Sequence, residues 1–120
     1  MPGALRARER RESTMNDREF EDAVDETFAN LEDDLDELDE HDIDIDSAGG
    51  ILTVTCPDAS QIIFSRQPAN REIWVAARSG GFHLARDGDG WTCGTTGESL
   101  GALSSRVLTE QLGTPVEVLG

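Results

Sequence analysis

The sequence predicts an α+β fold, a two-layer α/β sandwich in which an N-terminal and a C-terminal helix pack on one face of an antiparallel β-sheet of about six strands. Three observations support this prediction. An amphipathic helix lies near each end of the chain, short β-branched or alternating segments lie between them, and turn residues separate those segments at close spacing. Such short connections favour antiparallel hairpins over crossover units. A chain of 120 residues has room for one domain with a modest core.

The first predicted helix covers residues 17–38. Asn16 and Glu19 have the spacing of a capping box, in which each side chain accepts a hydrogen bond from the other residue's backbone N–H. Apolar residues then recur every three or four positions and form one helical face, while acidic residues occupy the other faces. The apolar face consists of Phe20, Val24, Phe28, Leu31, Leu35 and Leu38.

Acidic charge is concentrated in residues 17–46, which we call the acidic ridge. This segment holds 16 of the 25 acidic residues and one of the ten basic ones, so it carries the whole net charge of −15. Like-charge pairs four residues apart, such as Asp33 and Glu37, each destabilise a helix by roughly 0.2–0.5 kcal/mol. Acid that only supplied solubility, as in a salt-adapted organism, would also cover the exposed faces of residues 47–120, which are nearly neutral. We therefore interpret the ridge as a site for cations or for a basic partner surface.

Residues 42–46, Asp-Ile-Asp-Ile-Asp, predict a half-buried strand with its two isoleucines on one face and its three aspartates on the other. Neighbouring aspartates would lie about 6.5–7 Å apart and form a row of hard oxygen ligands. An EF-hand calcium loop beginning at Asp42 does not fit, because Ser47 stands at the position of the invariant glycine and Thr53 at that of the bidentate glutamate. The segment therefore extends the acidic ridge onto the first strand.

Five further strands and a second helix follow. Thr96 is the expected N-terminal cap of that helix and Gly113 its C-terminal stop, before a short final segment at 116–119. The strands are bounded by turns rich in Gly, Pro or Asp. They cover residues 51–56, 61–66, 72–77, 82–86 and 91–93, and the inward face of the second helix consists of Leu100, Leu103, Val107, Leu108 and Leu112.

One tryptophan is expected on the open face of the sheet. Alternation in the strand 72–77 places Ile73 and Val75 on the face toward the helices. Trp74 and Glu72 then lie on the face left to solvent. A tryptophan in such a place anchors a partner more often than it lies there without a role. The alternative is that an arginine stem or a loop covers the indole.

The two cysteines argue against a metal-thiolate site. Cys56 and Cys93 lie 37 residues apart, without a CxxC motif or clustered histidines, so we expect small buried hydrophobes with reduced thiols. The chain has no apolar run long enough for a membrane span. A net charge of −15 also disfavours nucleic acid and anionic membrane surfaces as partners.

The opening residues 1–14 contain four arginines and two glutamates without an apolar stretch. They do not resemble a secretory signal, and their glutamates argue against a mitochondrial transit peptide. We expect either a disordered N-terminal extension or the product of an upstream start codon, followed by one domain at 15–120. The expected location is the bacterial cytoplasm, with the mitochondrial matrix as the alternative.

Short motifs follow one another along the chain in a distinctive order. They are Met-Asn-Asp-Arg-Glu-Phe (15–20), Asp-Ile-Asp (42–44), Gly-Gly-Ile-Leu-Thr (49–53), Ile-Ile (62–63), Arg-Gln (66–67), Ile-Trp (73–74), Gly-Gly-Phe-His (80–83), Trp-Thr-Cys (91–93) and Thr-Gly-Glu (96–98). In this combination the chain resembles the frataxin family, and most closely its bacterial CyaY members. The resemblance covers about residues 15–120 and implies the same helix, β-meander and helix that the residue patterns predict.

The resemblance implies an accessory role in iron–sulfur cluster assembly. Family members bind ferrous and ferric iron along the acidic helix and the edge of the first strand, without an organic cofactor. They also associate with the cysteine desulfurase and the scaffold protein as iron donors or regulators. Carried over position by position, the implied metal-binding residues are Asp17, Glu21, Glu32, Asp33, Asp36, Glu37, Asp39, Asp42, Asp44 and Asp46.

The resemblance also implies a partner-binding surface on the sheet. Trp74 matches the family's exposed tryptophan, and we assign Arg66, Gln67 and Glu72 to the same surface. Glu72 departs from the family pattern, in which glutamine precedes the Ile/Val-Trp pair, and so adds a charge to this face.

Three classes of function stay open. The first is an accessory protein that binds Fe(II) and Fe(III) weakly. Fe(III) is a hard cation that prefers carboxylate oxygen, and the absence of a visible enclosing cage favours shallow sites. The second is a ferroxidase or iron-storage protein, although no paired carboxylate–histidine centre is evident, so we do not expect an enzyme. The third is a purely electrostatic adaptor that docks an arginine-rich patch. We expect a monomer, with oligomers under iron loading as an open question.

Overall fold

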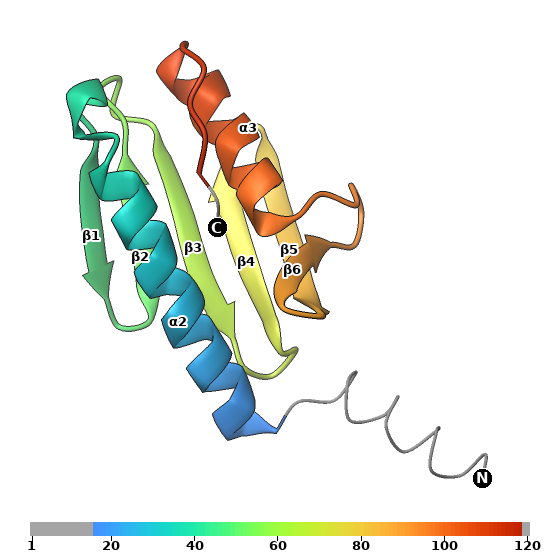
Figure 1. Ribbon diagram of the computed structural model, residues 1–120. Coiled ribbons are helices and arrows are strands. Elements are labelled where there is room, and N and C mark those ends of the chain that lie inside the picture. Colours follow the sequence, from blue (N-terminus) through green and yellow to red (C-terminus); the bar gives the residue numbers. More distant parts are fainter. Residues whose placement is uncertain (1–15, 119–120) are drawn as a thin grey trace, which may run out of the picture.

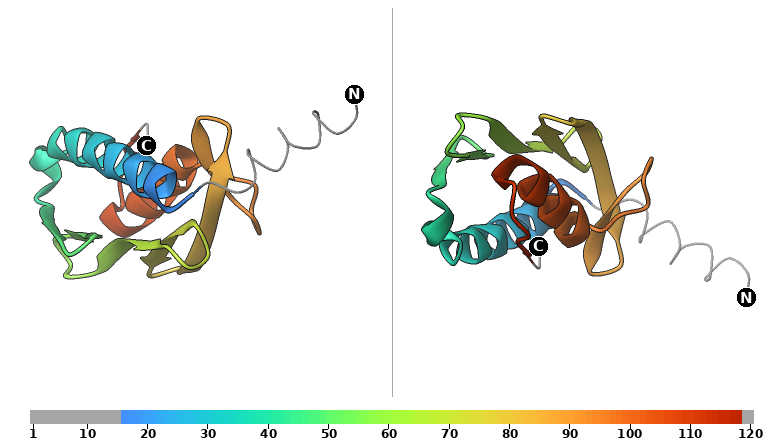
Figure 2. Two further views of the ribbon diagram at one scale, coloured as in Figure 1. Left: turned by 90° about the horizontal axis from the view of Figure 1, so that it is seen from below. Right: turned by 90° about the horizontal axis from the view of Figure 1, so that it is seen from above.

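The two-layer fold predicted from the sequence is confirmed. The computed structural model describes residues 16–118. Helices α2 (Asp17–Asp36) and α3 (Leu100–Leu112) cover one face of a six-stranded sheet (Figure 1). Views from below and above show both helices on the same side of the curved sheet (Figure 2). The other sheet face is therefore free of helices in the described part of the chain.

The sheet is an antiparallel meander. Its spatial order is the order of the sequence, β1 to β6, so each strand pairs with the one that follows it along the chain. Gly49 and Gly50, with φ of 61° and 79°, form the first turn, in a conformation that glycine adopts without strain. The strands are β1 (Asp44–Ala48), β2 (Ile51–Thr55), β3 (Gln61–Gln67), β4 (Glu72–Ala77), β5 (Gly80–Asp87) and β6 (Gly90–Cys93).

The core lies between the two layers, where period-two residues of the strands meet period-3.6 residues of the helices. Phe20 of α2 meets Trp91 of β6 edge to face, with ring centroids 6.0 Å apart. The indole Nε1 of Trp91 also donates to the Thr27 hydroxyl at 2.9 Å, which links α2 to β6. The buried side chains include Val24, Phe28, Leu31, Leu35, Leu52, Val54, Ile62, Phe64, Ile73, Val75, Leu84, Leu103, Val107 and Leu108.

The boundaries of the helix and the strand within the acidic ridge differ from the prediction. The capping box of Asn16 is present, but α2 ends at Asp36, and a short 3-10 helix η1 (Asp39–His41) follows. The predicted strand 42–46 begins two residues later, at Asp44, because Asp42 has a φ of 58°. That left-handed conformation does not fit an extended strand. Asp42 therefore lies in the connection that leads into β1.

The second helix also begins later than expected. Ser99, and not Thr96, is its N-terminal cap, with a hydroxyl that accepts from the backbone N–H of Ala102 at 3.1 Å. Thr96 instead accepts from the backbone N–H of Glu98 at 3.2 Å, within the loop before the helix. Gly113, with a φ of 74°, ends α3 as predicted.

Both cysteines are buried and free, as the sequence predicts: the exposed fraction is 3% for Cys56 and 1% for Cys93. Neither helix of the described residues has the length and apolar character that crossing a membrane requires. The predicted extension at 1–14 lies outside the described residues.

Candidate functional site

The amino-terminal half of the acidic ridge is paired with arginines from the sheet. Arg66 of β3 contacts the Glu21 carboxylate and lies 2.9 Å from an Asp25 carboxylate oxygen. Its guanidinium also lies 5.5 Å from the ring centroid of Phe28. Burial alone would lower the pKa of Arg66, but its hydrogen bonds and charge interactions with the two carboxylates raise it. The predicted metal ligand Glu21 is therefore already engaged by a cation.

Asp17, at the start of α2, is engaged in the same way. Its carboxylate lies 2.7 Å from the Arg71 guanidinium, which belongs to the turn between β3 and β4. An iron ion at Asp17 or Glu21 would have to compete with an arginine for the same oxygen atoms. The sequence prediction of ligands at this end missed these arginines because they come from a distant part of the chain.

The carboxyl-terminal half of the ridge has a different environment. The last turn of α2 has no basic residue, and the side chains of Asp33, Asp36 and Glu37 are exposed. Glu32 is half-buried on the same helix, and Asp39 lies in η1. Carboxylates at the negative end of a helix dipole repel one another and attract cations. This half of the ridge is therefore the more favourable place for a metal ion.

The first strand adds two exposed aspartates. Ile45 of β1 pairs with the buried Val54 of β2, so it faces the helices, and Asp44 and Asp46 face the opposite side of the sheet. Asp42 is exposed in the connection before β1. The structure thus places the strand carboxylates along the edge of the sheet, on the open face, and the helix carboxylates in the other layer.

These carboxylates do not converge on one centre. Within residues 16–118, no group of three or more His, Cys, Asp or Glu side chains has an arrangement that could enclose a metal ion. Hard cations on such a surface would keep part of their water shell and exchange readily. The described carboxylates of the ridge thus form an open row and not a cage.

The open sheet face presents Trp74 beside a histidine. The indole and the imidazole of His83 stack with ring centroids 4.2 Å apart and an interplanar angle of 7°. The indole Nε1 donates to Glu72 at 2.9 Å, and Gln67 pairs with Glu72 across β3 and β4. Trp74 is partly exposed, and His83 covers it, instead of the arginine stem or loop considered as the alternative.

Arg66 does not belong to this face, which corrects the sequence prediction. It lies opposite the buried Ile73 in the register of β3 and β4, and follows Ile62 and Phe64 at period two. Its side chain therefore projects toward the helices, where α2 supplies its carboxylate partners. The same period-two pattern was visible in the sequence and could have placed this residue correctly.

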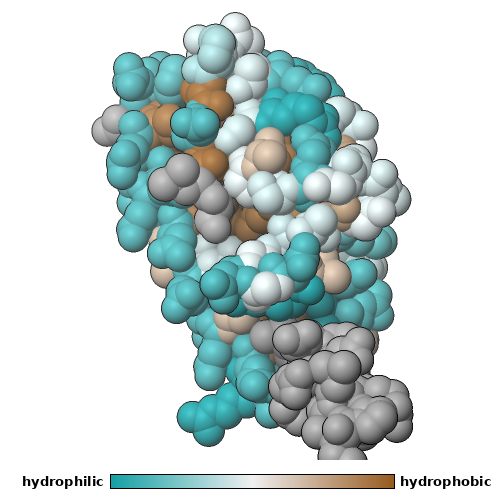
Figure 3. Space-filling model, turned by 45° about the vertical axis from the view of Figure 1, so that its right-hand side comes forward, coloured by the Kyte–Doolittle hydropathy of each residue, from teal (hydrophilic) through white to brown (hydrophobic). Residues whose placement is uncertain are grey.

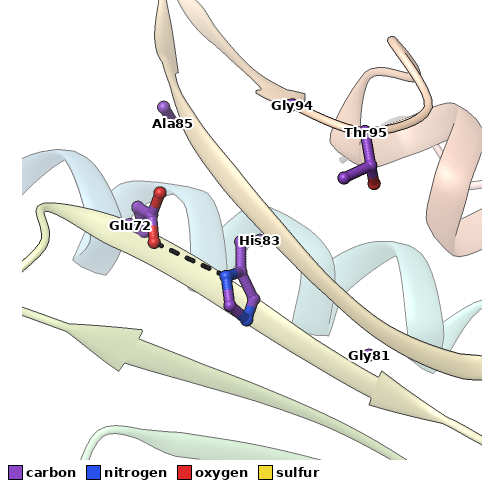
Figure 4. Close-up of a pocket in the computed structure, with 6 residues that line it drawn as sticks. All are labelled: Glu72, Gly81, His83, Ala85, Gly94 and Thr95. Carbon is purple, nitrogen blue, oxygen red and sulfur yellow. Dashed lines mark ion pairs between the residues drawn. The ribbon is translucent and has the colours of Figure 1, made fainter.

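A shallow hollow of about 240 Å³ lies next to Trp74 on the open face. Figure 4 shows Glu72 and His83 side by side, with Thr95 on the loop that follows β6. Sequence reasoning did not assign His83 or this loop to the site. Alternation along β5, with Gly81 and Ala85 on either side of His83, was the available signal. The hollow is lined by Glu72, Gly81, His83, Ala85, Gly94 and Thr95.

Hydrophilic residues predominate on the face of the molecule shown in Figure 3, and hydrophobic ones appear there in small areas between them. Among large hydrophobic side chains of the described residues, Ile51 is the exposed one, at 43%. Any partner of this chain would therefore meet mainly charged and polar groups, and recognition would depend on their placement.

Comparison with known sequences gives matches along most of the chain. The family model described as a frataxin-like domain matches residues 13–114. The chain is 43% identical over 106 residues to the iron-sulfur cluster assembly protein CyaY of Stutzerimonas stutzeri (strain A1501), covering 87% of this chain and 96% of the relative. It is 40% identical over 106 residues to the protein of the same name from Azotobacter vinelandii, again covering 87% and 96%.

Comparison with solved structures gives similar folds. A frataxin from Psychromonas ingrahamii has a TM-score of 0.79 at 25% identity, covering 86% of this chain and 97% of that chain. A trimeric frataxin from the yeast Saccharomyces cerevisiae, complexed with ferrous iron, has a TM-score of 0.62 at 27% identity, covering 76% and 82%. Each of these matches extends over at least three quarters of the chain.

Proposed function

The chain belongs to the frataxin-like family, and on that premise we propose that it is an iron-binding accessory protein of iron–sulfur cluster assembly. Its bacterial relatives are named as assembly proteins, and a yeast frataxin of the same fold is complexed with ferrous iron. In this proposal the cysteine desulfurase and the scaffold protein are its partners, and it acts on them as iron donor or regulator.

The observation behind the iron site is the uneven distribution of arginines along the ridge. The first half of α2 shares its carboxylates with Arg66 and Arg71, whereas its last turn has no basic residue. Fe(III) is a hard cation that prefers carboxylate oxygen, and Fe(II) also accepts carboxylate ligands, so we place both at the second half. The proposed ligands are Glu32, Asp33, Asp36, Glu37, Asp39, Asp42, Asp44 and Asp46.

Weak binding suits such a role. Exposed carboxylates in a row hold a partly hydrated ion that a partner with a better ligand set can remove. We propose no catalytic turnover of iron, and hence no enzyme. Oxidation of Fe(II) by oxygen faster than in protein-free buffer would support a ferroxidase instead.

The test is NMR chemical-shift mapping of the labelled chain, titrated with anaerobic Fe(II) and separately with the cysteine desulfurase. We expect iron to broaden signals from residues 32–46 and to leave those around Asp17 and Glu21 largely unchanged, because arginines already neutralise them. The variant Asp36→Asn/Glu37→Gln should need more Fe(II) for the same broadening, and Asp17→Asn serves as the matched control.

A purely electrostatic adaptor is the second candidate, favoured by the same dense charge. A response to the desulfurase without a response to iron would support the adaptor and contradict the iron site. Salt distinguishes the two as well, because a contact between exposed charges weakens steeply once the Debye length falls below about 8 Å.

A further inference from the structure

The hollow on the open face is formed by small residues around one histidine. Gly81 and Ala85 flank His83 on β5, and Gly94 directly follows β6. Because two of these residues are glycines and the third is an alanine, about 240 Å³ stays open above the backbone, bounded on one side by Thr95 (Figure 4). A long side chain from another molecule can therefore reach the backbone of β5.

One wall of the hollow is aromatic. The imidazole of His83 lies parallel to the indole of Trp74, and it lines the hollow as well. Although Trp74 covers one ring face, 56% of the His83 side chain stays exposed. A planar group that entered the hollow would find an imidazole surface already held in place by the indole.

The charge of the hollow is negative. Glu72 is the carboxylate among its lining residues, and its Oε1 accepts from Trp74 Nε1 at 2.9 Å and lies 3.9 Å from Nδ1 of His83. Only 26% of the Glu72 side chain is exposed, so water screens its charge incompletely.

Within residues 16–118, no arginine forms an ion pair with this carboxylate. Each of the six contacts other groups: Arg18 with Asp22, Arg66 with Glu21 and Asp25, Arg71 with Asp17, Arg78 with Asp58, Arg86 with the ring of Trp91, and Arg106 with Glu98 and Glu110.

We propose that this hollow receives an arginine side chain of a partner protein, with the guanidinium stacked on His83 and paired with the Glu72 carboxylate. Arginine fits better than lysine, because its planar, weakly hydrated cation stacks on ring surfaces and forms fork-shaped contacts with carboxylates. The proposal rests on the proposed function, since it names one contact that the open face makes with a partner in cluster assembly.

The first experiment uses isothermal titration calorimetry to measure the dissociation constant with which this chain binds the complex of cysteine desulfurase and scaffold protein. Glu72→Gln removes the charge but keeps an oxygen that accepts from Trp74, so the stack is preserved. We expect it to weaken binding by about tenfold, typical of a partly desolvated charged hydrogen bond. Asp89→Asn, which removes one charge from the turn after β5, should change the constant less than about twofold. Equal effects of the two variants, or no effect of Glu72→Gln, overturn the arginine site and leave the proposed function intact.

A second experiment applies if the wild-type chain does not bind that complex, which would contradict the proposed function. The labelled chain is then titrated with N-acetyl-arginine amide and with its uncharged analogue N-acetyl-citrulline amide, and NMR follows the backbone amides of His83 and Thr95. Shifts with arginine that are absent with citrulline and lost in Glu72→Gln support the site. Absent shifts, or equal shifts with both compounds, overturn it.

Discussion

Arg66 joins the two layers of the molecule through charge. It projects from β3 with 20% of its side chain exposed and pairs with Glu21 and Asp25 of α2. It also restricts its surroundings: a Cβ atom on Gly50 would lie 3.1 Å from Nε of Arg66, and Gly50 already has a φ of 79°. A side chain at that turn would therefore meet both steric and backbone strain.

Replacement of Arg66 by methionine tests this role. Methionine fills the space of the arginine stem but leaves two carboxylates without their cation. Because 40% of Glu21 and 64% of Asp25 are exposed, water replaces part of the lost interaction, and we expect the free energy of unfolding to fall by about 1–2 kcal/mol.

Urea denaturation measures the effect, and Arg18→Met is the matched control. Arg18 is 91% exposed and lies 4.0 Å from Asp22, so its replacement should change stability by less than about 0.5 kcal/mol. A similar loss in both variants would show that the effect comes from removing one positive charge anywhere on the chain, and not from the ion pairs of Arg66 with α2.

At the scale of elements, the carboxyl end of α2 combines two unfavourable interactions. Acidic side chains four residues apart repel one another, and the helix dipole places negative partial charge beside them. The helix is held nevertheless, because its apolar face is buried against the sheet and its capping box is complete. Packing thus offsets a charge pattern that would weaken an isolated helix.

The double variant Asp36→Asn/Glu37→Gln should therefore be more stable than the natural chain. Relief of the repulsion from Glu32 and Asp33 is expected to add about 0.5–1 kcal/mol and to raise the melting temperature by a few degrees. Differential scanning calorimetry measures the change in melting temperature. Asp17→Asn removes a carboxylate from the favourable end of the dipole and should lower the melting temperature. A lower melting temperature in the double variant would show that these carboxylates stabilise the fold.

The sequence predicted the elements better than their ends. Periodicity identified both helices and all six strands, because a buried face leaves a repeat that does not depend on distant residues. The start of β1 depends on the positive φ of Asp42, and the start of α3 on a loop that gave Thr96 another partner. The pair of Glu21 with Arg66 joins residues 45 positions apart, so a local pattern could not show it. Alternation places Trp74 and His83 on the same sheet face, but their stacking also depends on the register of β4 and β5.

At the scale of the whole molecule, a net charge of −15 acts against compactness. The arginines that contact the acidic ridge within the described residues do so in the first half of α2, so salt is left to screen the charge repulsion in the second half of the ridge. The ion pairs elsewhere, such as those of Arg106 with Glu98 and Glu110, lie in a nearly neutral part of the chain.

Salt should therefore stabilise this protein. We expect the melting temperature to rise by several degrees between 10 mM and 1 M NaCl, as the Debye length falls from about 30 Å to about 3 Å. Thermal unfolding followed by circular dichroism gives the measurement. The rise should be smaller in Asp36→Asn/Glu37→Gln, which has less repulsion to screen. A fall with NaCl would mean that the arginine ion pairs outweigh the repulsion.

The edge strand β1 has a further consequence for how copies of the chain behave toward one another. Its outer side has no strand partner among the described residues, and such an edge can pair with a strand of another molecule. Asp44 and Asp46 give every copy the same negative edge, so two copies repel each other there. Cations held by these aspartates would weaken that repulsion. The carboxylates that we propose for iron would thus also determine how much metal the chain can bind before its copies begin to associate.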